Sequence, residues 1–351
     1  MRIGFAVVAL AAALAATPSL AIQRTFVASY GNDANACTPG SPCRSFTAAL
    51  LKTSGFGEII VLDSAGYGPV TIAKSVSIIA PQGIYAGVTV PTGDGITVNA
   101  LPAIVTLRGL TINGQGTGGI GVNIMNATRV NIEGCVISNM SSNGILHSAP
   151  GSQLSVLDTI VRSNGGTGIG IAADASVVID HVRSEQNAFD GFYIIPGTTT
   201  AQAAITDSLF AWNGTNGVSI DSVPGRHTHV AVERSVMPAN SGSGLSAYGT
   251  GFGFVTVGRN VFSNNADAAI SVSHNNRVMV SENNFNAGNA TGVRADGGSV
   301  EVRASANAFS TNGGFQFQQL NGAFDSFLRP DLCSEFRCPA SHMRIAQSDA
   351  N

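Results

Sequence analysis

Residues 154–171, LSVLDTIVRSNGGTGIGI, contain the unit that most of this chain repeats. Leu154 and Val156 alternate with polar residues and predict a short strand, and a second apolar strand begins at Ile160 after a polar corner. The Ser-Asn-Gly-Gly segment then turns the chain, and a third strand begins at Gly168. The stretch therefore predicts one complete coil of a repeating β structure.

The same pattern recurs along the chain with a period of about 25 residues. Short Val/Ile/Phe strands with Gly and Asn corners indicate an all-β parallel β-helix, a solenoid with single strands, and the Leu-x-x-Leu-x-Leu pattern of leucine-rich repeats is missing. Alignment on the apolar residue before the Asn turn predicts one buried column of side chains: Ile112, Ile137, Val161, Phe210, Met237, Phe262, Phe285 and Phe309.

The asparagines at these turns, such as Asn164, are expected to be structural. Asn tolerates left-handed backbone better than most residues. Stacked Asn side chains can also hydrogen-bond from one coil to the next. We therefore predict an Asn ladder rather than a reactive site.

The composition suits one elongated solenoid. Only 11% of residues are charged, whereas there are 42 glycines and the hydrophobic fraction is 44%, which fits tight corners around a continuous apolar interior. The net charge is −3 and Lys and Arg do not cluster, so we expect no nucleic-acid partner.

Residues 1–21 predict a signal peptide, with a charge at Arg2, an apolar stretch and a Ser-Leu-Ala cleavage site before Ile22. The mature protein should be secreted or periplasmic, without a transmembrane segment. Residues 22–58 differ from the repeats and predict an N-terminal cap with a short helix that begins after Ser45, because an open solenoid end would expose its interior. The right-handed β-helix is expected over 59–327, and a C-terminal loop and tail over 328–351.

The cysteines fit an exported protein. Cys37 and Cys43 bracket one loop and Cys333 and Cys338 bracket another, so each pair can close a local disulfide. Cys135 lies inside a coil and is expected to be a free, buried residue.

The segment FVASYGND from Phe26, PCRSF from Pro42 and EIIVLDSAGYG from Glu58 resemble secreted bacterial right-handed parallel β-helix proteins of the pectin-lyase-like superfamily. The resemblance spans nearly the whole mature chain. It implies a right-handed coil of three sheets and, commonly, binding of or action on polysaccharide. It does not specify a reaction, because a fold does not determine a function.

Motifs of two enzyme families in this superfamily can be compared directly. Residues 177–181, VVIDH, are similar to the Val-Trp-Ile-Asp-His stretch of pectate lyases, but the Arg-x-Pro-x-x-Arg stretch that carries the lyase base is absent. The Asn-Thr-Asp, Asp-Asp and Gly-His-Gly motifs of polygalacturonases are absent too. These absences favour a protein that binds polysaccharide or another cell-surface glycan without catalysis. A polysaccharide lyase or glycoside hydrolase that acts on acidic polysaccharide is the alternative.

One corner column carries the candidate catalytic residues. Equivalent residues on stacked coils lie about 4.8 Å apart, so such a column is a spatial cluster. A solvated salt-bridge ladder is its simplest interpretation. The column contains Asp158, His181, Asp207, Arg234, Arg259 and Glu282, with Asp180 and Glu233 beside it; the catalytic candidates are Asp158, Asp180, His181, Asp207, Arg234 and Arg259.

Two chemistries could use this column. Removal of the proton beside a uronate carboxylate needs a base, such as neutral His181 or an unprotonated Arg, and a cation, such as Arg234 or Arg259. Hydrolysis needs two carboxylates instead. Asp158 and Asp207 lie two coils apart, about 9.6 Å, near the upper limit for inverting glycosidases.

The outward position of the strand after the Gly corner predicts a sugar-binding surface. Tyr193 is the best candidate for stacking on a sugar ring, and Asp190 and Arg294 complete the predicted substrate-binding set. The predicted column is Asn123, Leu146, Gly170, Tyr193, Ser219, Ser246, Ser271, Arg294 and Gln316.

No metal or other cofactor is predicted. His227 and His229 should share one face of a strand, but no third ligand lies nearby in the sequence. Calcium could bind corner carboxylates, although no Asp-x-Asp loop supports it.

Overall fold

The chain forms a right-handed parallel β-helix in this computed structural model. The structure describes residues 22–281 and 284–326. The predicted signal peptide, Glu282, the C-terminal tail and the Cys333–Cys338 pair lie outside the described residues. Within the described part, no helix has the length and hydropathy that a membrane span requires.

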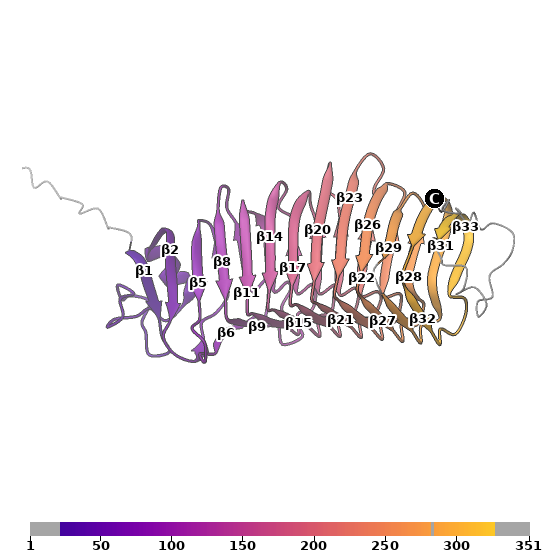
Figure 1. Ribbon diagram of the computed structural model, residues 1–351. Helices are drawn as coiled ribbons and strands as arrows, with labels where there is room; N and C mark the ends of the chain where they lie inside the picture. The colour runs from indigo at the N-terminus through magenta and orange to yellow at the C-terminus, as the bar shows by residue number, and fades with distance from the viewer. Residues whose placement is uncertain (1–21, 282–283, 327–351) are drawn as a thin grey trace, which may run out of the picture.

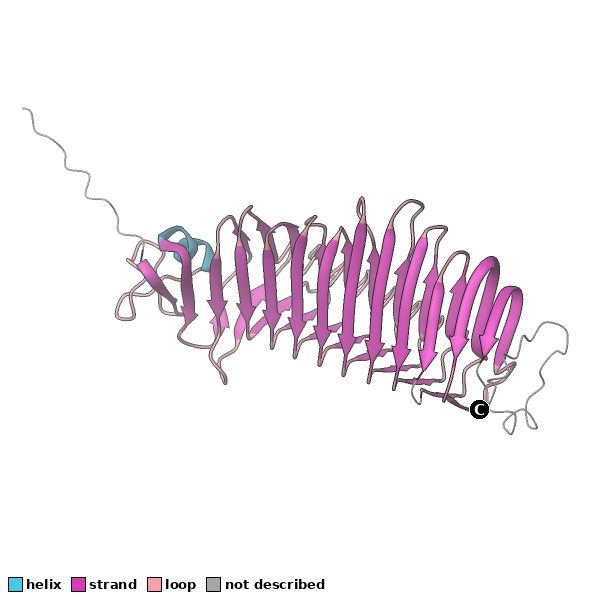
Figure 2. Cartoon of the chain, turned by 45° about the horizontal axis from the view of Figure 1, so that its top comes forward, coloured by secondary structure: helices cyan, strands magenta, loops and turns pink. Residues whose placement is uncertain are grey.

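The strands stack into parallel faces that run along the long axis of the molecule, and we call them sheets 1, 2 and 3 (Figures 1 and 2). Sheet 1 contains β4 (Val70–Ile72), β7 (Ile96–Asn99), β10 (Val122–Asn126), β13 (Ile145–His147), β16 (Ile169–Ala172), β19 (Phe192–Ile195), β22 (Val218–Asp221), β25 (Leu245–Tyr248) and β28 (Ala268–Ser273).

Sheet 2 contains β1 (Ile22–Val27), β2 (Thr53–Val61), β5 (Val76–Ile79), β8 (Ile104–Arg108), β11 (Arg129–Glu133), β14 (Ser152–Leu157), β17 (Ala175–Asp180), β20 (Thr200–Thr206), β23 (His227–Glu233), β26 (Phe252–Gly258) and β29 (Arg277–Ser281). The longer strands β31 (Thr291–Ala304) and β33 (Phe317–Ser326) join sheets 1 and 2 near the C-terminal end. Sheet 3 contains β3 (Ala65–Gly66), β6 (Ala86–Thr89), β9 (Leu110–Asn113), β12 (Val136–Ser138), β15 (Ile160–Arg162), β18 (Arg183–Glu185), β21 (Leu209–Ala211), β24 (Val236–Pro238), β27 (Val261–Ser263), β30 (Phe285–Ala287) and β32 (Ala308–Ser310).

The coil that begins at β14 shows how the sequence builds this shape. Alternation along the strand buries Leu154 and Val156, and the corner at Asp158 has a left-handed φ of 49° that redirects the chain into β15. Val161 is buried there, and the chain turns again into sheet 1. Burial of each such aliphatic side chain stabilises the fold by about 2 kcal/mol.

The predicted Asn ladder is confirmed. Asn164 Nδ2 donates to Asn187 Oδ1 at 2.9 Å, and the backbone N–H of Asn164 donates to the same oxygen at 3.2 Å. Each step therefore satisfies buried polar groups of two coils. The ladder continues through Asn213, Asn240, Asn265, Asn289 and Asn312.

A glycine precedes the sheet 1 strand on successive coils because the backbones approach closely there. A Cβ on Gly191 would lie 2.7 Å from the carbonyl oxygen of Gly217, and one on Gly217 would lie 2.6 Å from that of Gly244. Only a residue without a side chain fits, so these glycines keep the coils in register.

The N-terminal segment agrees with the sequence in several details. Helix α1 (Phe46–Lys52) follows Ser45, whose hydroxyl accepts a hydrogen bond from the N–H of Ala48 at 3.2 Å, so the predicted helix and its cap are confirmed. Strand β1 pairs with β2, so this segment also adds a strand to sheet 2, and β2 crosses the predicted boundary at residue 58.

The cysteine predictions within the described residues are confirmed. Cys37 and Cys43 form a disulfide with their Cα atoms 4.7 Å apart. Cys135 is free and buried, and burial raises the pKa of its thiol to about 11.

Two members of the predicted columns are wrong. The register pairs Phe262 with Asn286, and Phe285 with Val261, so Phe285 does not continue the phenylalanine column. Arg294 pairs with Gln318 rather than with Gln316. The late coils differ in length, so the predicted register is off by one residue at Phe285, which reverses the face of a strand, and by two at Gln316, which keeps the face and changes the neighbour.

Candidate functional site

The corner column lies between sheets 2 and 3, where one residue of each coil turns the chain. Asp158, His181, Asp207, Arg234 and Arg259 have φ values of 49°, 52°, 48°, 49° and 56°, so they occupy equivalent left-handed positions. The backbone N–H of each of the first four bonds to the following coil, as from Asp158 N to Asp180 O at 3.1 Å. The structure thus brings these predicted residues together on consecutive coils.

Their side chains form ion pairs with one another. Arg234 holds both carboxylate oxygens of Asp207, with Nε at 3.0 and 3.1 Å and Nη2 at 2.8 Å from Oδ2. Glu233 lies 3.3 Å from Arg234 Nη1 and 2.8 Å from Arg259 Nη2. The cations of this column are therefore neutralised by neighbouring carboxylates, as the salt-bridge interpretation predicts.

Asp180 and His181 form a second pair within the corner column. Asp180 Oδ2 lies 3.0 Å from His181 Nδ1, and its Oδ1 accepts a hydrogen bond from the Thr206 hydroxyl at 2.6 Å. Asp180, His181 and Asp207 offer ligand atoms within 4.8 Å of one another. A cation at this place would compete with Arg234 for Asp207 and with Thr206 for Asp180.

The electrostatics of the corner column disfavour a residue that acts as a catalytic base. The hydrogen bond that His181 donates to Asp180 raises the pKa of His181, and the hydrogen bonds that Arg234 donates to Asp207 raise the pKa of Arg234. Conversely, Arg234 lowers the pKa of the Asp207 carboxyl. These shifts favour the protonated forms of His181 and Arg234, whereas proton abstraction needs one of them neutral.

The register of the predicted sheet 1 column is confirmed from Asn123 to Arg294. Its exposure is not uniform, because Gly170 and Ser219 are buried. Tyr193 is half-buried and lies between Gly170 and Ser219 on the neighbouring strands. Serines occupy the same position on the next three strands, β22, β25 and β28. We call this row from Tyr193 to Ser271 the sheet 1 strip.

Two residues beside the strip were missed in the sequence. The Tyr193 hydroxyl donates to Asp221 Oδ2 at 3.1 Å, and Asp221 pairs with Tyr248 on the next strand. Burial, followed by the charge of Asp221, raises the pKa of Tyr248 to about 12 and also raises that of Tyr193. Both phenols therefore stay protonated. The alternation of β22, which turns Ser219 and Asp221 to one face, was the signal that could have found them.

Asp190 and Arg294 brace the coils. Asp190 Oδ1 accepts hydrogen bonds from Thr215 Oγ1 at 2.5 Å and from Ser219 Oγ at 2.7 Å. Arg294 binds both oxygens of Asp267 at 2.5 Å. Asp190 lies beside Tyr193, as predicted, whereas Arg294 belongs to a strand four places further along the sheet.

The sequence matches the family model described as the right handed beta helix region over residues 84–203 and 196–326, which together make up more than half of the chain. The chain belongs to this right-handed β-helix family. No curated protein matches it by sequence.

Solved structures with the same fold include three that this β-helix matches over most of its length. Pectate lyase Pel9A has 15% identity and a TM-score of 0.54, over 82% of this chain and 80% of that one. The A-module of the Azotobacter vinelandii mannuronan C-5 epimerase AlgE4 has 15% identity and a TM-score of 0.53, over 78% and 91%. The enzymatically active domain of bacteriophage CBA120 tailspike protein 2 has 13% identity and a TM-score of 0.53, over 81% and 45%. At these identities the likeness concerns the fold.

Proposed function

We propose that this right-handed β-helix is an exported protein that binds an extended polysaccharide along the sheet 1 strip. The observation that carries the proposal is the half-buried Tyr193, hydrogen-bonded to Asp221, in a row whose partly exposed serines are Ser246 and Ser271. Ser219, between them and Tyr193, is buried and donates to Asp190, so it supports the row without reaching the ligand. An aromatic ring held in place by a hydrogen bond offers contact area to a sugar at low entropic cost.

The chemistry beside the strip suits a polymer rich in hydroxyl groups. Asp190 and Asp221 are carboxylates that can accept hydrogen bonds from sugar hydroxyls. The same charges repel uronate groups, and the nearest cation of the predicted set, Arg294, is held by Asp267. A neutral polysaccharide is therefore favoured over an acidic one.

A glycan array tests the proposal, with Tyr193→Ala compared with Tyr30→Ala. Tyr30 is an exposed tyrosine of the N-terminal segment and serves as the matched control. We expect Tyr193→Ala to weaken retention of at least one neutral polymer about tenfold, since stacking of an aromatic ring is lost. Equal retention of every bound glycan by both variants would contradict binding at the strip.

An enzyme acting on acidic polysaccharide remains the second candidate because Asp180, His181 and Asp207 converge within 4.8 Å. Bound polymers should be incubated with the protein, and unsaturated uronates and new reducing ends measured. If the corner column catalyses a reaction, His181→Ala, Asp207→Asn and Arg234→Ala must abolish turnover while the melting temperature changes by only a few degrees, because exposed ion pairs contribute little stability. Full turnover in these variants would mean that the corner column is structural and not catalytic.

A further inference from the structure

A shallow trough crosses the outer face of sheet 2, on a different side of the coil from the sheet 1 strip. It spans β17, β20, β23 and β26 and has a volume of about 370 Å³. Neighbouring strands are about 4.8 Å apart, so the trough runs about 14 Å along the solenoid axis. A volume of this size is typical of pockets for small ligands and short oligomers.

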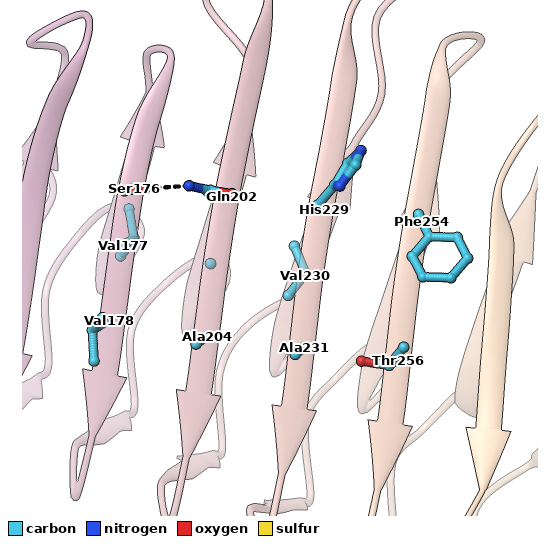
Figure 3. Close-up of a pocket in the computed structure, with 11 residues that line it drawn as sticks. Ser176, Val177, Val178, Gln202, Ala204, His229, Val230, Ala231, Phe254 and Thr256 are labelled. Atoms are coloured by element: carbon cyan, nitrogen blue, oxygen red, sulfur yellow. Dashed lines mark hydrogen bonds between the residues drawn. The ribbon is translucent and has the colours of Figure 1, made fainter.

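Two outward rows of side chains shape the trough (Figure 3). The row nearer the starts of the strands contains Ser176, Gln202, His229 and Phe254, and the row nearer their ends contains Val178, Ala204, Ala231 and Thr256. The two alanines are short, whereas Val178 and Phe254 stand on either side of them. The hollow therefore results from small residues on two central strands.

Aromatic rings form the wall over β23 and β26. His229 packs against Phe254 with ring centroids 6.3 Å apart, and His227 packs against Phe252 at 6.3 Å. Phe254 is 43% exposed, so its ring is available to a ligand. Phe252 lies outside the trough lining, and the Arg277 guanidinium, paired with Glu301, sits 5.9 Å from its ring centroid. Rings that support one another across adjacent strands are already ordered before binding.

Hydrogen-bonding groups complete the lining. Gln202 Nε2 donates to Ser176 Oγ, which fixes the amide and leaves Gln202 Oε1 without a protein partner in the described residues. The His229 ring and the Thr256 hydroxyl also lack protein hydrogen bonds within the described part of the chain. The lining residues include no Asp, Glu, Lys or Arg.

We propose that this trough is a second glycan-binding site, which takes a short segment of a neutral polysaccharide. Aromatic faces and alanines meet the C–H faces of the sugar rings, while the free amide oxygen, imidazole and hydroxyl bond to sugar hydroxyls. The lining itself carries no cation for an acidic polymer, and the neighbouring Arg277, which pairs with Phe254 in the register, is neutralised by Glu301 at 3.1 Å. The site is separate from Tyr193, so the molecule can hold two glycan segments at once.

The dimensions favour a sugar over a protein partner. A stable protein interface buries at least about 1,000 Å² around an apolar core. Here the apolar groups Val178, Ala204 and Phe254 alternate with polar ones within about 14 Å, and the charged ladder at Asp180 and Glu233 borders the strand ends.

The test measures the affinity for hydroxyethylcellulose, a soluble neutral glucan, by affinity electrophoresis and calorimetry, with polygalacturonate as the acidic probe. Phe254→Ala removes the exposed ring, and Ala204→Arg fills the trough from an exposed position. Phe56→Ala, at an exposed phenylalanine in the N-terminal segment, is the matched control. We expect both trough variants to weaken neutral-glucan binding about tenfold or more. Tyr193→Ala should leave a residual binding phase that Phe254→Ala removes.

Several results would overturn this site. The first is that the unaltered protein does not bind hydroxyethylcellulose. The second is that both trough variants bind hydroxyethylcellulose with unchanged affinity. The third is that the protein binds polygalacturonate more tightly than hydroxyethylcellulose. Complete loss of binding in Tyr193→Ala would mean a single site on sheet 1, which overturns the trough but not the proposed function. Light scattering that shows an oligomer broken by Ala204→Arg would assign the trough to a second copy of the chain instead.

Discussion

Asn187 Nδ2 lies 3.1 Å from Asn213 Oδ1, one coil further along, and both side chains are buried. The same Asn213 oxygen accepts the backbone N–H of Asn187 at 3.2 Å, and Asn213 Nδ2 donates to Asn240 at 3.1 Å. One side chain therefore satisfies polar groups on the coils before and after it. The Asn ladder therefore contributes stability to the β-helix beyond that of hydrophobic burial.

We expect Asn213→Leu to lower the free energy of unfolding by about 3 kcal/mol, because it leaves buried groups of Asn187 without partners at about 1–3 kcal/mol each. Denaturant unfolding measures the change. Asn126→Ala is the matched control, since Asn126 bonds to Asn99 between coils at 2.8 Å but at an exposed place. A similar loss in both variants would show that burial does not matter to the ladder.

Gly134 occupies the corner column one coil before Asp158, with φ of 58°, and a Cβ there would meet no atom within 4 Å. Gly134→Ala therefore isolates the cost of left-handed backbone, which should be about 1–2 kcal/mol. The check is thermal unfolding beside Gly40→Ala, where a Cβ also meets nothing and φ is not positive. No difference between the two would mean that the corners carry no backbone strain.

Phe262 lies in the interior with no exposed surface, between Met237 and Asn286 in the register. Phe262→Ala should cost on the order of 3–5 kcal/mol, since it leaves a large cavity that stacked coils cannot fill by collapse. Phe189→Ala, at a phenylalanine that is 55% exposed, should change stability by less than about 1 kcal/mol. Urea unfolding of both variants provides the measurement.

His147 is buried in sheet 1, and burial lowers its pKa to about 4. Its Nδ1 accepts the N–H of Ala149 at 3.2 Å and its Nε2 lies 2.9 Å from Ser152 Oγ, an arrangement that the neutral ring satisfies. The unfolded chain takes up a proton near pH 6.5 whereas the folded chain does so near pH 4. Stability should therefore fall as the pH drops from about 6.5 to about 4, by about 3 kcal/mol in all.

The measurement for His147 is the unfolding free energy between pH 7 and pH 4. His147→Gln should remove this part of the acid sensitivity, while His274→Gln, at an exposed histidine, should retain it. Acid sensitivity that persists unchanged in His147→Gln would assign it to the carboxylates.

His181 should titrate above the usual histidine value because Asp180 bonds to its ring and attracts its charge. We expect Asp180→Asn to lower the pKa of His181 in an NMR titration, and Asp207→Asn to lower it by less, since Asp207 acts only through its charge. An unchanged pKa of His181 in the Asp180→Asn variant would mean that solvent separates the Asp180–His181 pair.

Much of this fold could be predicted from local patterns. Alternation marked the buried residues of strands such as β14, and Ser45 marked the start of the helix. Asn164 and its equivalents indicated a ladder because the same side chain recurs at each turn. The corner column and most of the sheet 1 column were also predictable, since they lie in coils where the spacing between strands is clear.

The sequence by itself determined the coil, its corners and its inward and outward faces, because these depend on alternation and on left-handed positions within a few residues. Only the tertiary structure decided which residues meet across coils. The coils differ in length, so three pairings depend on hydrogen-bonded register. They are the pairing of Asp221 with Tyr248, the pairing of Phe262 with Asn286 rather than Phe285, and the meeting of Gln202 and Phe254 around the trough. That register is set by the summed contacts of neighbouring strands, which a repeat of varying length does not specify.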